Sequence, residues 1–142
     1  MPTIATDPLV KEVRIDAKPD TVFAFFTEAD KITRWLAAEA TTDPRPGGIN
    51  HQTHHFEGVD YLLRGEFVEL DPPHRLVFTW GFENTEMGVT PGGSTVEVTL
   101  TRVDGGTHVR LVHSGLPEPA LATHDPGWDE QLGNLARALE SA

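Results

Sequence analysis

The chain has 142 residues without a cysteine, a length that predicts one domain over residues 1–142 and a composition that excludes disulfides and thiolate metal sites. Its 11 Lys and Arg against 22 Asp and Glu give a formal charge of −11, which disfavours nucleic acid and anionic membrane surfaces as partners. With no signal peptide and no apolar run long enough for a membrane span, the sequence predicts a cytoplasmic protein.

The N-terminal part predicts one strand followed by two short helices. Residues 1–7 are expected to be flexible. Apolar residues alternate with polar ones over 9–17, which favours a strand. Pro19 suits the first turn of a helix over 19–27, and apolar residues at helical spacing predict a second helix over 30–36.

From residue 38 onward the pattern turns to antiparallel strands, separated by turns rich in proline and glycine. The sequence DGG at 104–106 is the strongest hairpin signal of the chain, and residues 83–93 are expected to form a long polar loop. The side that each residue of 59–70 faces stays open, because apolar residues occur on both faces. The predicted strands are 49–56, 59–70, 75–82, 94–103 and 107–115.

The C-terminal residues predict a long amphipathic helix. Asp125 suits the cap of this helix, Pro126 suits its first turn, and apolar residues from Trp128 to Leu139 recur at helical spacing. A curved antiparallel sheet wrapped around this helix would bury one face of each element. The sequence therefore predicts an α+β fold with two short helices after the first strand.

The sequence HQTHHF, residues 51–56, raises the question of a metal site. On a helix, His51, His54 and His55 could reach one ion, but the neighbouring pattern predicts a strand. On a strand, His54 points away from the other two, which sit ~13 Å apart at ~3.3 Å per residue. Because zinc needs ligand nitrogens ~2.0–2.1 Å away, we predict no metal and no cofactor.

No catalytic residue is predicted either. His113 and Ser114 are neighbours on a strand and therefore face opposite ways, so the histidine cannot activate the hydroxyl. The G-x-S-x-G turn that presents a nucleophilic serine is absent from the sequence. An enzyme is consequently the less favoured interpretation.

Four stretches, VRIDAKPDTVFAFFTEADKITRWL, GEFVELDPPHRLVFTW, THVRLVHSGL and GWDEQLGNLARAL, carry a family resemblance over residues 9–140. The chain resembles the SRPBCC (START and pollen-allergen-like) superfamily, and within it the activator-of-heat-shock-protein-90-ATPase homologue-like family. The resemblance implies a helix-grip fold with a cavity between the sheet and the terminal helix. Family members include ligand-binding, resistance and stress-associated proteins and co-chaperone domains, while the wider superfamily adds lipid carriers and polyketide cyclases.

The resemblance implies three functions. The first is non-catalytic binding of a small apolar or aromatic molecule, with aromatic walls for affinity and polar groups for orientation. The second is a chaperone-associated or stress-related interaction module, although chaperone-activating members carry an N-terminal domain that this sequence does not show. The third is a polyketide cyclase or aromatase. The candidate ligand-binding residues are Trp35, Tyr61, Arg64, Glu66, Phe78, Trp80, His113, Trp128 and Leu132, with His113 either lining the cavity or hydrogen-bonded in the core.

Overall fold

The computed structural model describes residues 7–83 and 89–140. Residues 1–6 of the N-terminus that was expected to be flexible lie outside the described residues, and so do residues 84–88 of the predicted loop at 83–93. The elements, in chain order, are β1 (Leu9–Ile15), α1 (Pro19–Thr27), α2 (Ala29–Ile32), β2 (Glu39–Thr42), β3 (Ile49–Phe56), β4 (Val59–Asp71), β5 (Arg75–Trp80), β6 (Ser94–Val103), β7 (Gly106–Ser114) and α3 (Glu118–Glu140).

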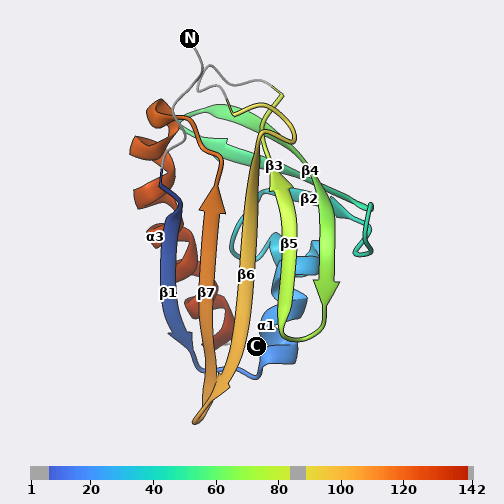
Figure 1. Cartoon of the computed structure of the whole chain (residues 1–142), viewed down its shortest axis with the longest axis vertical. Helices are drawn as coiled ribbons and strands as arrows, with labels where there is room; N and C mark the ends of the chain where they lie inside the picture. The colour runs from blue at the N-terminus through green and yellow to red at the C-terminus, as the bar shows by residue number, and fades with distance from the viewer. Residues whose placement is uncertain (1–6, 84–88, 141–142) are drawn as a thin grey trace.

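The strands form one antiparallel sheet of seven, in the order β1-β7-β6-β5-β4-β3-β2. Figure 1 shows β2 and β3 crossing one end of the sheet obliquely, while α3 and α1 lie behind the strands that run along the long axis. The predicted α+β helix-grip architecture is thus confirmed. No helix within the described ranges is both long and apolar enough to cross a membrane.

Turn chemistry sets the strand pairing at both predicted hairpins. Glu57 and Gly58 have φ of 49° and 79°, the left-handed pair that suits the twist of a two-residue hairpin, and Phe56 pairs with Val59 across them. The second hairpin turns over Asp104 and Gly105, where φ at the glycine is 74°. These turns fix the register of β3 with β4 and of β6 with β7.

The hydrophobic core lies between the concave face of the sheet and the helices. Alternate residues of β5, β6 and β7 point inward and are buried, as are Val22, Phe25 and Phe26 of α1. The structure also settles which face of the sheet each residue of β4 occupies. Leu63, Gly65 and Phe67 are buried against the core, while Arg64 and Glu66 point to the outer face.

The boundaries of two predicted helices were wrong. The second helix covers only Ala29–Ile32 and continues as turns, and α3 begins at Glu118, so that Pro126 lies inside the helix. A proline inside a helix removes a backbone hydrogen bond and costs about 3 kcal/mol. The added turns nevertheless bury Ala120 and His124 against the sheet, and we infer that this packing offsets the cost.

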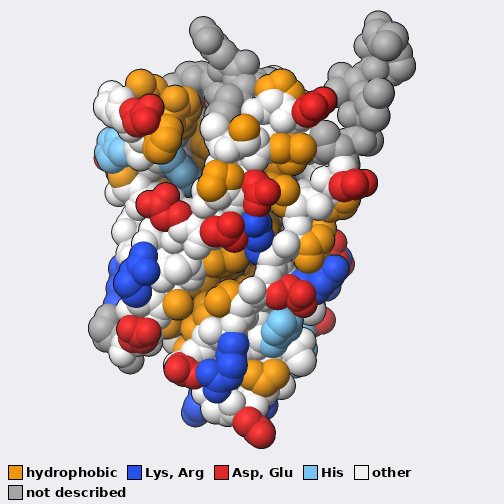
Figure 2. Space-filling model, turned by 90° about the vertical axis from the view of Figure 1, so that its left-hand side faces the viewer, with side chains coloured by type: hydrophobic (Ala, Val, Ile, Leu, Met, Phe, Trp, Pro, Cys, Tyr) orange, Lys and Arg blue, Asp and Glu red, His pale blue; other side chains and the backbone are white. Residues whose placement is uncertain are grey.

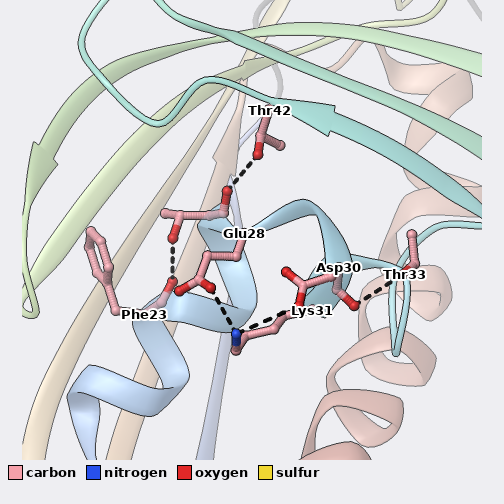
Figure 3. A network of polar contacts seen from close by, with 7 residues as sticks. Phe23, Glu28, Asp30, Lys31, Thr33 and Thr42 are labelled. Carbon is pink, nitrogen blue, oxygen red and sulfur yellow. Dashed lines mark hydrogen bonds and ion pairs between the residues drawn. The ribbon is translucent and has the colours of Figure 1, made fainter.

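A small polar network holds the connection between α1, α2 and β2 (Figure 3). The Thr42 hydroxyl donates to the carbonyl of Thr27 at 2.8 Å, and Lys31 pairs with Glu28 at 2.8 Å. The Thr33 hydroxyl donates to the carbonyl of Asp30 at 3.1 Å and closes the last turn of α2. These bonds fix the start of the segment 33–38, which faces α3.

Candidate functional site

The sheet and α3 enclose an open cavity of about 680 Å³. The segment 33–38 forms one wall, the tip of the β3–β4 hairpin a second, and side chains of α3 between Thr123 and Ala138 a third. Trp80 and Phe82 lie at its floor. Figure 2 views the molecule from the left-hand side of Figure 1, where hydrophobic side chains are interspersed with acidic and basic ones across the face.

Trp80 is the centre of an aromatic cluster beneath the cavity. Its ring centroid lies 5.1 Å from that of Trp128 and 5.7 Å from that of Phe82. The imidazoles of His54 and His113 lie 5.5 and 5.6 Å from it, both edge-on. Edge-to-face packing of this kind adds specific attraction to the burial of aromatic surface, so these side chains form a pre-shaped apolar floor.

A chain of hydrogen bonds fixes His113 behind this floor. The Trp128 indole N–H donates to Nδ1 of His113 at 2.9 Å, so the imidazole proton sits on Nε2. That Nε2 donates to the Ser94 hydroxyl at 2.8 Å, and the hydroxyl donates to the Trp80 carbonyl at 2.7 Å. Because both ring nitrogens bond to the protein and only 1% of the residue is exposed, His113 is a hydrogen-bonded core residue.

His124 is held in the same manner but faces the cavity. The Trp80 indole N–H donates to its Nε2 at 3.2 Å, and its Nδ1 donates to the Ala120 carbonyl at 2.9 Å. On the facing strand, Nε2 of His54 lies 2.8 Å from Oε1 of Gln52, which is buried. The protein thus uses its own polar groups to orient two imidazoles that line the cavity.

Burial keeps these histidines uncharged at neutral pH. Loss of hydration lowers the pKa of His113 to about 3 and that of His54 to about 4, and the neighbouring His124 adds to both shifts. Burial also lowers the pKa of His124, while its bond to the Ala120 carbonyl opposes the shift. The cavity therefore presents polar but neutral groups beside its aromatic rings.

The structure brings four of the predicted site residues together at the cavity: Trp35, Tyr61, Trp80 and Trp128. Phe78, His113 and Leu132 are buried behind the lining. Arg64 and Glu66 point to the outer face of the sheet, where Arg64 pairs with Glu83 at 3.5 Å and the Glu66 side chain is exposed. The alternation along β4 separates these two from Tyr61.

Sequence reasoning did not select His54, Phe82, His124, Arg34 or Arg137, which also line the cavity. His54 could have been found from the alternation of β3, which places it inward with Gln52. His124 stands four residues before Trp128 and so shares its helical face, but the predicted helix began after it.

The three histidines of HQTHHF separate as predicted for a strand. His54 packs over Trp80, while His51 lies on the outer face beside Arg64, where burial and that guanidinium lower its pKa. His55 pairs with Asp60 at the hairpin tip. Over residues 7–83 and 89–140, no group of three His, Asp or Glu side chains has the spacing to hold a metal ion.

Comparison with known proteins gives matches over most of the chain. The family described as Activator of Hsp90 ATPase homolog 1-like protein matches residues 16–140. The human Activator of 90 kDa heat shock protein ATPase homolog 1 is 29% identical over 112 residues, which is 78% of this chain. The chain spans only 30% of the length of that human protein.

Solved structures share the fold. Protein MLL2253 of Mesorhizobium loti superposes with a TM-score of 0.82 at 23% identity, over 95% of this chain and 98% of that one. DynU16, a protein of the dynemicin biosynthetic locus, superposes with a TM-score of 0.77 at 26% identity, over 95% of this chain and 48% of its own.

Proposed function

This chain belongs to the Activator of Hsp90 ATPase homolog 1-like family, and from that premise we propose that it is a binding module. It holds a small, largely apolar or aromatic molecule between the sheet and α3 without catalysing a reaction on it. A cytoplasmic location and a link to stress response stay predictions.

The observation that carries the proposal is the aromatic cavity itself. Its volume of about 680 Å³ falls in the ~300–1,000 Å³ range of small-molecule sites. Trp35, Tyr61, Trp80 and Trp128 supply apolar surface, and burial of such surface contributes ~25 cal/mol per Å². The neutral imidazole of His54, which bonds to Gln52 through Nε2, adds its second ring nitrogen as a polar atom that selects orientation, while His124 is held by Trp80 and Ala120 and supplies ring surface.

Gly127 offers a direct test, because it lines the cavity on α3 and a Cβ at this position meets no atom within 4 Å. Gly127→Leu should therefore place a branched side chain inside the cavity, next to Trp128, without disturbing the backbone, and it should block the binding of a ring system there. The measurement is a two-dimensional NMR titration of labelled protein with fatty acids, sterols, flavonoids and aromatic polyketides. We expect saturable shifts of the Trp80 and Trp128 indole signals in the wild type and none in the variant.

Ala122→Leu is the control, since Ala122 lies exposed on the same helix and does not line the cavity. Gly127→Leu also gains helix propensity, so thermal unfolding of both variants is measured beside binding. Equal binding by the two variants, or no shift with any compound, would contradict the proposal. Turnover of a bound compound would contradict its non-catalytic part and favour the cyclase or aromatase alternative.

A chaperone-associated role is the second candidate, supported by the match to human Activator of 90 kDa heat shock protein ATPase homolog 1. Since the chain spans only 30% of the length of that protein, similarity alone does not carry the role over, and the test must measure stimulation of the chaperone's ATPase activity directly. Purified 90 kDa heat shock protein would be assayed for ATPase activity with and without this chain. An unchanged rate, together with no complex in analytical ultracentrifugation, would remove this candidate.

A further inference from the structure

The cavity is chemically different at its two ends. His124 and Trp128, in the first half of α3, border the end that also contains His54, Trp80 and Phe82. Arg34 and Arg137 border the end beside the last turns of α3. An aromatic, uncharged end and a cationic end therefore lie along one helix.

Both arginines lie at the same end of the cavity. A nitrogen of the Arg34 guanidinium lies 3.4 Å from the carbonyl of Ala138, the neighbour of Arg137 in sequence, and its Cζ lies 5.1 Å from the Phe25 ring centroid. Arg137 donates to the side-chain oxygen of Asn134. These contacts hold the guanidiniums in place yet leave most of their N–H groups available.

Neither arginine has a carboxylate partner within the described ranges, where the lysines and arginines that form ion pairs are Lys11, Arg14, Lys31, Arg45, Arg64 and Arg75. Arg102 and Arg110 have no ion pair there either, but they do not line the cavity. In a chain of formal charge −11, two unpaired guanidiniums at one end of the cavity make that end cationic. Glu130 also borders the cavity and is exposed. Glu130 lies two residues from Trp128 and seven from Arg137 in sequence. Its negative charge therefore repels a ligand anion from the aromatic end more than from the arginine end.

We infer that the cavity takes an elongated aromatic molecule with an anionic group at one end, its rings on Trp80 and Trp128 and its anion on Arg34 and Arg137. The inference rests on the proposed function and names the ligand class. Arg137 stands nine positions after Trp128, about 13 Å along a helix that rises ~1.5 Å per residue. The ring system and the long side chain of Arg137 each span part of this distance, so a linker of a few bonds should join the ring system to the anion.

The test uses two fluorescent probes, pyrenebutyrate and pyrenebutanol, which share the pyrene ring and the four-carbon chain and differ in the end group, an anionic carboxylate or an uncharged hydroxyl. We expect the wild type to bind the carboxylate about tenfold more tightly than the alcohol, the effect of one good charge-assisted hydrogen bond. Arg137→Gln should remove most of this preference, measured as the ratio of the two affinities. Arg34→Gln combined with Arg137→Gln should abolish it, and Arg137→Lys should retain part of it.

Arg102→Gln is the matched control, because Arg102 is exposed on β6 and does not line the cavity. It should leave both affinities unchanged. Since Arg34 also contacts Phe25, thermal unfolding of each variant is compared, and Arg137→Gln alone decides the test if the double variant unfolds.

The outcomes separate the two claims. Equal binding of the two probes by the wild type would overturn the inference and leave the proposed function standing. A carboxylate preference that survives in a folded double variant would also overturn it, since the anion would then lie elsewhere. Failure of both probes to bind would contradict the proposed function and the inference with it.

Discussion

Replacement of His113 by alanine is expected to lower the free energy of unfolding by about 3 kcal/mol or more. The imidazole accepts from Trp128 and donates to Ser94, and all three residues are buried. Alanine would leave a buried indole N–H without an acceptor, which alone costs ~1–3 kcal/mol. The space vacated by the ring adds the cost of a cavity. Urea unfolding followed by tryptophan fluorescence measures the sum.

His108→Ala is the control for this variant. His108 occupies the same strand but faces outward, where Nε2 lies 3.0 Å from a Glu12 carboxylate oxygen. A partly exposed pair of this kind contributes ~0–1 kcal/mol, so the loss should be small. If the two alanine variants were equally stable, the hydrogen-bond chain from Trp128 to the Trp80 carbonyl would not contribute as the geometry indicates.

Acidification from pH 6.5 to pH 5.5 should destabilise the protein. The pKa of His113 is lowered from 6.5 to about 3 and that of His54 to about 4. The unfolded chain therefore binds protons in this interval that the folded chain does not. Stability is full above the unfolded pKa and falls as pH decreases, by a slope that approaches ~1.4 kcal/mol per pH unit for each histidine.

Urea unfolding at pH 7.5, 6.5 and 5.5 measures this slope. His54→Phe should reduce the slope by the contribution of one histidine. The phenyl ring can still pack on Trp80, but the titrating group is removed. Phe82→Leu, which changes a buried neighbour of His54 without removing a proton site, should lower stability equally at each pH. A stability independent of pH over this interval would show that His54 and His113 are charged or exposed in the folded state.

Most of the fold was predictable because local patterns and long-range packing agree there. The alternation of apolar residues in β6 and β7 and the DGG turn between them specify a hairpin, whatever element packs against it. The start of α3 was not predictable, because Pro126 locally signals a first turn. The earlier turns of α3 depend on the contact between His124 and Trp80, which lie 44 residues apart.

The residues of the candidate site also divide into those that local sequence patterns could predict and those that they could not. Its aromatic members Trp35, Trp80 and Trp128 could be selected because each lies on an apolar face that periodicity reveals. The positions of Arg64 and Glu66 could not be assigned, since β4 carries apolar residues on both faces and its register is set by pairing with β3. Arg34 and Arg137 carry no sequence signal at all, because a charged residue on a helix or turn is usually solvated surface.

The amino-acid sequence alone thus specifies the family, the order of elements and the aromatic residues that face inward, because these follow from periodicities of a few residues. The three-dimensional fold assigns the roles. It turns His113 into a core hydrogen-bond partner, brings His54 and His124 to the cavity wall, and sets two arginines at one end of it. The reason is physical: hydration, pKa and unpaired charge depend on neighbours distant in sequence, and only packing decides which neighbours meet.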